Sequence, residues 1–476
     1  MNPLESLVAR TRITPQPLSH AAGAPALLAA CGLTLDIGRQ RVTPDDLGLL
    51  HDIATAAGVM PAHAAMMAGD LVNASEARPA LHTLLRAESH EHAGMSDVLA
   101  TKARMAEFAE AVRVGDWRGA TGESITDVIN IGIGGSDAGP RLVVSALSGS
   151  RTGPKVHFVS NVDGSALARL LPQLDARRTL AIVSSKSFST RETLLNARAV
   201  QAWFAAAGIG ATGLAQHMVT VSARPDAARI LGLPADRNFP LWDWVGGRFS
   251  LWSAIGLPVM LGFGPAVFDE LLAGARVMDQ HSLETRLGAN LPANLAMLAA
   301  WNSIALKAPM HCLLPYDDRL GPMIPWLQQL EMESLGKSRR TDGKMALYPT
   351  GQAVWGGVGT DAQHTFFQWL RQGTGRTSVD ILWAEQHEHD YPEHHASLLA
   401  NARAQADALV SPDADSQAVN AVSTIVIDRL TPTRLGALLA LYEHKTTMLA
   451  TILGINAFDQ PGVELGKQLA RKLEGL

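Results

Sequence analysis

Residues 127–140, DVINIGIGGSDAGP, decide the fold, because a β-branched run there ends in a cluster of glycines. The run predicts a buried strand, and the turn that contains Gly135 and Ser136 predicts a tight passage into a helix that begins near Asp137. Glycines at such a turn let backbone amides approach an anion, and the helix N-terminus adds positive potential. The stretch is typical of a phosphate loop in an α/β sheet, although a tight turn without a ligand also fits.

Two nucleotide-binding loops do not fit this stretch. The pattern G-x-G-x-x-G requires glycine where Asp137 stands, and a Walker loop requires Gly-Lys where Gly139 and Pro140 stand. Asp163 follows the next predicted strand and could still act as a ribose-binding carboxylate. A cofactor site therefore stays an alternative.

A second polar loop, SSKSFSTRET at 184–193, follows the predicted strand at 179–185. Hydroxyls and backbone amides at a helix start can hold a phosphate monoester. Ser189 and Glu192 also fit a capping box, but capping uses only one of the hydroxyls. Both loops would open at the carboxyl edge of one sheet, where ligands bind in open α/β folds. The pair favours a phosphate site, with the candidates Ser185, Lys186, Ser187, Ser189 and Thr190.

Alternating strand and helix patterns predict an α/β protein with two domains, each a parallel sheet covered by helices. One series of β-branched runs lies at 127–133, 155–161, 179–185 and 217–223, and another at 310–316, 377–384 and 420–430. Helices are expected at 283–307, 323–336, 363–372 and 433–453. The Ala-rich start is helical in pattern, with Thr43 as a cap and Pro44 in the first turn. We divide the chain into a helical segment (1–114), a first α/β domain (115–265) and a second α/β domain (266–476).

The bulk composition excludes several classes of partner. The 476 residues carry a formal net charge of −5, which offers nucleic acid no large cationic surface. Two cysteines give no disulfide framework, and the N-terminus lacks the pattern of a signal peptide. Residues 251–268 are uncharged, but Gly256, Pro258 and other breakers favour a buried helix, a turn and a second buried segment over a membrane span. We expect a cytoplasmic protein that binds neither nucleic acid nor membrane.

Three later segments place one ionisable group each among apolar or glycine-rich neighbours: Arg248 in GGRFSLWSAIGLP, Glu333 in QQLEMESLGKS and His364 in GGVGTDAQHTFFQWLRQG. Poor solvation would shift the pKa of such groups and suit them to acid–base work. Structural explanations stay open, namely a cap or ion pair for the arginine, a solvated helix face beside Lys337 for the glutamate, and a core position for the histidine. Lys467 alone would indicate a snorkelling surface lysine.

Six segments, taken in order, resemble the glucose-6-phosphate isomerase family: INIGIGGSDAGP, SKSFSTRET, GGRFSLWSAIGL, MESLGKS, GTDAQHTFFQ and FDQPGVELGKQLA. Residues 73–86, NASEARPALHTLLR, extend the resemblance to nearly the whole chain. Six ordered motifs are much more specific than any one of them.

The resemblance implies two αβα sandwich domains of the sugar-isomerase type and a homodimer. It implies reversible conversion of D-glucose 6-phosphate to D-fructose 6-phosphate, a step of glycolysis and gluconeogenesis, through a cis-enediol and without cofactor or metal. Glu333 would move the proton between C2 and C1, and Arg248 would stabilise the enediolate. His364 from the other subunit and Lys467 would open the sugar ring. The implied substrate contacts are Gly135, Ser136, Gln329 and Gln460 at the sugar, and Ser185, the Lys186 backbone, Ser187 and Thr190 at the phosphate.

The chemistry supports the first two roles independently, because removing a proton beside a carbonyl needs a base in a dry pocket and a cation for the developing charge. Two positions depart from the family pattern: Leu335 replaces the usual asparagine, and Pro461 replaces a common tryptophan. Neither departure removes a catalytic group, but both leave the tolerance of mannose 6-phosphate open.

Three other functions stay as alternatives. A metal-dependent isomerase could use the histidines of QHEHDYPEHH, His387, His389, His394 and His395, although this acidic stretch favours a solvated loop. A dehydrogenase would need a nicotinamide site. A sugar-phosphate sensor could use the same sandwich domains without needing Glu333, His364 and Lys467 together.

Overall fold

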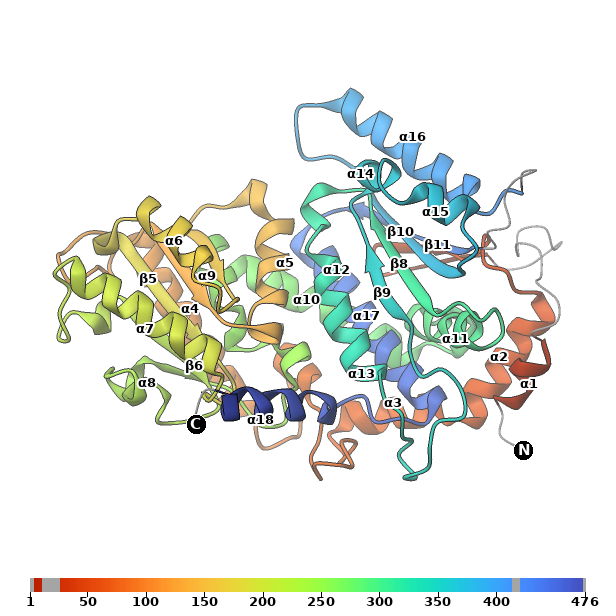
Figure 1. Ribbon diagram of the computed structural model, residues 1–476, viewed down its shortest axis with the longest axis horizontal. Helices are drawn as coiled ribbons and strands as arrows, with labels where there is room; N and C mark the ends of the chain where they lie inside the picture. The colour runs from red at the N-terminus through yellow and green to blue at the C-terminus, as the bar shows by residue number, and fades with distance from the viewer. Residues whose placement is uncertain (1–3, 11–25, 413–419, 474–476) are drawn as a thin grey trace.

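The computed structural model describes residues 4–10, 26–412 and 420–473, except for the side chains of Glu464, Lys467 and Arg471. Figure 1 shows two lobes, each built on a β-sheet that helices cover. The predicted α/β class with two parallel-rich sandwiches is confirmed.

The first lobe contains a five-stranded parallel sheet in the order β4-β3-β5-β6-β7. The strands are β3 (Asp127–Ile131), β4 (Lys155–Val159), β5 (Thr179–Ser184), β6 (Met218–Ser222) and β7 (Asn238–Pro240). One face packs against α6 (Ser165–Leu170), α7 (Arg191–Ala206) and α8 (Ala227–Ile230). The other packs against α4 (Met95–Val114), α5 (Ala138–Ala146) and α9 (Leu257–Phe263). Because both faces are covered, every residue of β5 is buried, which explains its continuous apolar run.

The second lobe contains a six-stranded sheet in the order β1-β2-β11-β10-β8-β9. Its parallel strands are β8 (Met310–Pro315), β9 (Ala353–Gly356), β10 (Thr377–Gln386) and β11 (Ala421–Arg429). The outer face packs against α14 (Gly359–Gln363), α15 (Phe367–Gln372) and α16 (Pro392–Ala408). An antiparallel hairpin of β1 (Leu27–Ala30) and β2 (Leu33–Asp36) extends the edge at β11. The N-terminal segment is therefore not helical throughout, and the proposed divisions at residues 114 and 265 stay predictions.

The remaining N-terminal elements follow the predicted signals. They are α1 (Glu5–Ala9), α2 (Pro44–Ala56) and α3 (Val59–Ala68). Thr43 caps α2 as predicted, in a capping box in which Thr43 Oγ1 accepts from the Asp46 amide at 3.1 Å. Residues 251–268 do not form one continuous helix, because they are divided among 3-10 turns, α9 (Leu257–Phe263) and the start of α10 (Pro265–Glu284). Within the described ranges, no helix has both the length and the apolar character to cross a membrane.

A single hydrophobic core joins the two lobes. It contains Val128 and Ile182 from the first sheet together with Leu313 and Ile425 from the second. The long central helix α17 (Pro432–Leu453) contacts β2 of the second sheet and packs along α10 (Pro265–Glu284) and α11 (Leu291–Ile304), and α10 in turn contacts α4 and α9 of the first lobe. The two sheets are therefore parts of one packed unit.

Four successive polar residues of α17 are buried, and each has a partner on a different part of the chain. Tyr442 Oη donates to Asp380 at 2.9 Å, Glu443 accepts from Arg86 at 2.5 Å, His444 Nε2 lies 2.6 Å from Asp279 Oδ1, and Lys445 lies 2.7 Å from Glu331. Arg86 also donates twice to Asp279, at 2.7 and 2.6 Å. Buried charges persist only when they are paired in this way.

Candidate active site

The two polar loops meet at the topological switch point of the first sheet. β3 and β5 are neighbours, with Ile131 beside Val183, and the chain proceeds from them to opposite sides of the sheet. Ligands of open α/β sheets bind beyond the strand ends at such a point. Ser184 Oγ donates to Asn130 Oδ1 at 3.1 Å, and Asn130 Nδ2 donates to Ser136 O at 3.0 Å. The two loops are thus tied together.

The glycine loop lies against the 3-10 helix Gly247–Trp252, which carries Arg248. A Cβ at Gly135 would lie 1.9 Å from Gly247 O, so only glycine permits this approach. A Cβ at Gly134 would lie 2.9 Å from Gln329 Nε2. The loop, the arginine segment and the glutamate helix therefore converge at one place.

The hydroxyls of the serine loop are not used for helix capping. Thr190 is the N-cap residue of α7 and makes no side-chain cap bond, so the alternative capping box of Ser189 and Glu192 is not formed. Ser185 Oγ lies 3.3 Å from Thr190 Oγ1, and Ser189 Oγ lies 2.9 Å from Ser187 Oγ. The loop therefore presents a cluster of hydroxyls at the positive end of a 16-residue helix.

Two residues hold the serine loop in an unusual shape. Phe188 is buried at a φ of 48°, a region that is costly for a bulky side chain. Lys186 Nζ donates to Asp243 O and Val245 O, both at 2.9 Å, and burial lowers its pKa. These acceptors precede Arg248, so the serine loop is connected to the arginine segment.

Arg248 is buried, and its guanidinium is held by several acceptors. Nε donates to Ser334 Oγ at 2.7 Å, and Nη2 donates to two backbone carbonyls of the segment 457–459. The remaining nitrogen, Nη1, lies 3.2 Å from Glu333 Oε2 and 3.4 Å from Gln460 Oε1. Burial lowers the pKa of Arg248 and Glu333 opposes that shift, but a guanidinium stays charged in proteins. A fixed cation therefore lies beside a carboxylate.

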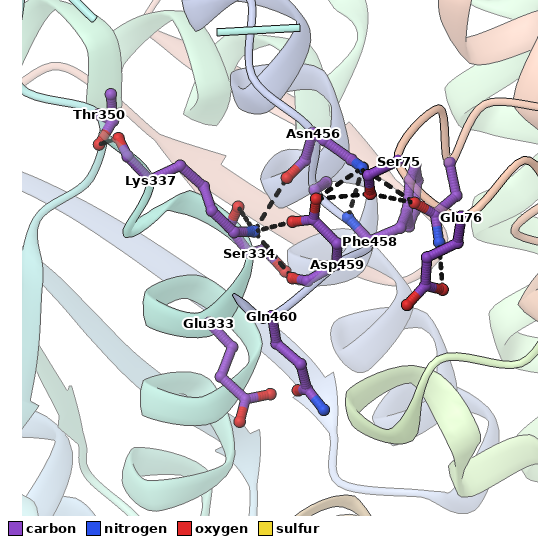
Figure 2. A network of polar contacts seen from close by, with 12 residues as sticks. Ser75, Glu76, Glu333, Ser334, Lys337, Thr350, Asn456, Phe458, Asp459 and Gln460 are labelled. Atoms are coloured by element: carbon purple, nitrogen blue, oxygen red, sulfur yellow. Dashed lines mark hydrogen bonds and ion pairs between the residues drawn. The ribbon is translucent and has the colours of Figure 1, made fainter. Parts of the chain in front are cut away.

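Glu333 follows a π-helical turn. The predicted helix at 323–336 consists of α12 (Met323–Leu327), a wide turn at Gln328–Met332 and α13 (Glu333–Leu335). Single turns of this kind often occur at functional sites. Gln329 Nε2 lies 3.4 Å from Glu333 Oε2, and Figure 2 shows the side chains of Glu333 and Gln460 next to each other.

His364 and Lys467 are not brought to this cluster by the described contacts. His364 follows α14 and is exposed, so the poorly solvated surroundings predicted for it are absent in the single chain. Its position explains this, because the polar turn between α14 and α15 lies at the surface. Lys467 belongs to α18 (Glu464–Leu473), and its side chain lies outside the described part of the structure.

Two alternative sites receive a structural explanation. Asp163 Oδ1 accepts from the Ser165 amide at 3.0 Å and from its hydroxyl at 2.7 Å, so this carboxylate stabilises the start of α6. In the histidine-rich stretch, the rings of His387 and His389 stack 5.1 Å apart. Among the residues that the structure describes, no three His, Cys, Asp or Glu side chains are arranged to hold a metal ion.

Ser334 and the carbonyls of Ala457 and Asp459, which accept from Arg248, were not predicted from the sequence. Lys337, considered as a neighbour of Glu333 on a helix face, instead forms an ion pair with Asp459 at 3.0 Å. The sequence does contain polar residues in the motifs MESLGKS and FDQPGVELGKQLA that could have indicated these contacts, but it does not show which of them pair. Leu335 is 1% exposed and packs into the core beside Gly351, on a different helix face from Glu333.

This architecture, with two parallel-rich sandwiches of the sugar-isomerase type, is that of the phosphosugar isomerases. The chain belongs to the phosphoglucose isomerase family, whose sequence profile matches residues 36–475. It is 46% identical to the glucose-6-phosphate isomerase of Burkholderia orbicola (strain AU 1054) over 465 residues, which are 93% of this chain and 86% of that protein.

Solved structures agree with this assignment. A crystal structure of a glucose-6-phosphate isomerase from Chlamydia trachomatis matches with a TM-score of 0.89 and 31% identity, covering 100% of this chain and 95% of that one. A hypothetical protein from Thermus thermophilus matches with a TM-score of 0.72 and 27% identity, covering 93% and 99%.

Proposed function

We propose that the chain is an aldose–ketose isomerase that interconverts D-glucose 6-phosphate and D-fructose 6-phosphate, with Glu333 as the base. The observation that carries the proposal is the pair of Arg248 and Glu333, in which an anchored guanidinium lies 3.2 Å from a carboxylate. Membership of the phosphoglucose isomerase family supports the choice of substrates.

The phosphate would bind at the start of α7, on Ser185, Ser187, Thr190 and the backbone of Lys186. The hydroxyl cluster and the helix N-terminus supply donors and positive potential for an anion. The Lys186 ammonium donates to backbone carbonyls, which is consistent with a backbone role for this residue at the phosphate. Gly135 and Ser136 would then line the sugar, which would extend toward Gln329 and Gln460.

Glu333 would remove the C2 proton of the open-chain aldose. The electrons of that C–H bond form the C1–C2 double bond, and the negative charge develops on O1, which takes a proton to give the cis-enediol. Glu333 then returns its proton to C1 while O2 loses one, which gives the ketose. Arg248 would stabilise the developing charge at little reorganisation cost, because its acceptors already hold it in place. The scheme uses no cofactor or metal.

Ring opening would use His364 and Lys467. The exposed position of His364, away from the described contacts of Glu333, supports its contribution to the active site of a second subunit in a homodimer. Each site would then need residues from both chains.

Deuterium exchange tests the base. With glucose 6-phosphate in deuterated water, the parent protein should incorporate deuterium at the reacting carbons, and Glu333→Gln should reduce the rate at least ~10³-fold because proton transfer loses its base. Glu88→Gln, at a carboxylate that is 76% exposed, provides the matched control. Normal incorporation by Glu333→Gln would disprove the base assignment, and absence of turnover in the parent would favour a sugar-phosphate sensor.

A further inference from the structure

Lys337 lies where the glutamate motif meets the C-terminal segment. Its ammonium donates to Ser334 O at 3.2 Å, Asn456 O at 3.0 Å and Asp459 O at 2.9 Å, and it lies 3.0 Å from Asp459 Oδ1. The side chain is only 10% exposed, and Figure 2 shows it at the centre of these contacts. Binding the last carbonyls of a helix would explain the contact with Ser334, but not the other three.

Asp459 is also held from the opposite side. Ser75 Oγ donates to Asp459 Oδ2 at 2.6 Å, and Asn456 Nδ2 donates to the same oxygen at 3.1 Å. Asn456 Nδ2 also lies 2.9 Å from Asn73 Oδ1. Burial acts to raise the pKa of Asp459, but Ser75 and Lys337 outweigh it and the pKa is lowered. The carboxylate is therefore charged, and it connects three distant segments of the chain.

The same C-terminal segment provides the acceptors of Arg248. Arg248 Nη2 donates to Asp459 O at 3.1 Å and also to Ala457 O. Asp459 O thus accepts from both Lys337 and Arg248, and Gln460 follows it directly. A shift of this segment would move the acceptors of the guanidinium.

We propose that Lys337 is a positioning residue for the isomerase reaction, because it fixes the segment 456–460 through Asp459 and so aims Arg248 at the substrate. The inference rests on the role proposed above for Arg248. Without the ammonium, three partly buried carbonyls each lose one donor and the Asp459 carboxylate loses its lysine partner, which is costly enough to displace the segment. A displacement of about 1 Å at a catalytic group can lower the rate of a reaction ~100-fold.

Substitution in the full-length protein tests this role. Lys337→Met should lower kcat ~10- to 100-fold while KM changes less than ~3-fold, because the substrate still binds but the cation is misplaced. Lys344→Met, at an exposed lysine of the loop that follows, is the matched control and should leave both constants unchanged. If Lys337→Met lowers the melting temperature but leaves kcat unchanged, Lys337 is structural only and the proposal is wrong.

A double-mutant cycle separates positioning from a direct role. In an Arg248→Ala background, Lys337→Met should lower kcat by less than ~3-fold, because its effect passes through the arginine. If the double variant lowers kcat by the full product of the factors measured for the two single variants, the proposal is wrong. If Arg248→Ala alone leaves kcat unchanged, the proposed role of Arg248 is wrong, and this outcome is distinct from a failure of the positioning role of Lys337.

A milder variant covers the case in which Lys337→Met does not fold. Ser75→Ala removes one donor to Asp459 and leaves the lysine in place. It should lower kcat several-fold with KM nearly unchanged, and an unchanged kcat would contradict the proposal.

Discussion

The Nη1 atom of Arg248 lies 3.2 Å from Oε2 of Glu333, and the arginine side chain is 3% exposed whereas the glutamate side chain is 28% exposed. The cation is therefore fixed by its surroundings, while the carboxylate has room to exchange this partner for a substrate hydrogen. This difference in exposure suits a site in which Arg248 stays fixed and stabilises the developing negative charge while Glu333 transfers the proton.

Arg248→Ala should lower kcat about 10²- to 10³-fold, because the developing enediolate loses its fixed positive charge. KM and the inhibition constant of inorganic phosphate should change much less, since the phosphate loops stay intact. Steady-state kinetics with glucose 6-phosphate measure both. An increase in KM with kcat preserved would place Arg248 in substrate binding instead.

Arg248→Lys serves as the charge-preserving comparison. A lysine ammonium cannot reach Ser334, the carbonyls of 457–459 and the carboxylate in the fixed fork geometry of a guanidinium. We expect kcat between those of the parent and the alanine variant. Full activity of the lysine variant would show that charge alone matters.

Mixed dimers test the proposal that the protein is a homodimer in which His364 acts in the active site of the second subunit. Glu333→Gln and His364→Gln should each be nearly inactive, and a mixed dimer should regain one complete site that combines the intact glutamate of one chain with the intact histidine of the other. Random mixing of equal amounts should restore roughly a quarter of the parent activity, by the symmetry of a two-site dimer. No recovery after confirmed subunit exchange would place His364 in its own chain's site.

Arg86→Met should reduce the free energy of unfolding by about 3–5 kcal/mol, because it leaves Asp279 and Glu443 as buried charges without their cation. Lys102→Met is the control, since this lysine forms an exposed pair with Asp269 and its loss should cost about 1 kcal/mol or less. Urea denaturation measures both changes. Equal losses would mean that the buried network contributes no more than a surface pair.

Acidification should destabilise the protein partly through His63. Burial, followed by the influence of His444, lowers its pKa from 6.5 to about 3, whereas nearby Asp279 acts to raise it and Arg86 to lower it. The unfolded imidazole takes up a proton below pH 6.5 but the folded one does not, so its contribution to stability is complete above pH 6.5 and is lost as the pH falls toward 3.

The variant His63→Gln should remove this dependence. Between pH 6.5 and 4.5 the free energy of unfolding should fall less steeply, by up to about 1.4 kcal/mol per pH unit. The exposed His389→Gln is the control, and urea denaturation at several pH values provides the measurement. An unchanged slope in the His63 variant would mean that this histidine is already protonated in the native state.

Much of the fold followed from local patterns. The strand and helix around Gly135 were predictable because a β-branched run, a glycine turn and the N-cap position of Asp137 all lie within 14 residues. The hairpin at 27–36 and the short β9 were not predicted, since four-residue strands give too few alternations to distinguish them from their surroundings.

The candidate site was predictable as a set of residues but not as a set of contacts. Glu333 and Arg248 lie in distinct motifs, and their pairing depends on the packing of the two lobes. The π turn before Glu333 leaves no mark in the sequence QQLEM, because an α-helix would suit the same residues. Lys337 and Asp459 are separated by 122 residues, so only the folded chain reveals their contact.

The central helix α17 has a consequence for dissection of the protein. Its polar row draws in Arg86 from the N-terminal segment and Asp380 from the second sheet, and its apolar faces belong to the core shared by both sheets. A fragment that ended at residue 265 would lack both this helix and α10, and it would expose Arg86 and the surfaces of α4 and α9 that contact α10. The two lobes visible in Figure 1 are therefore not independent folding units. We expect that neither lobe can be expressed as a stable fragment, exchanged between proteins or evolved as a separate domain.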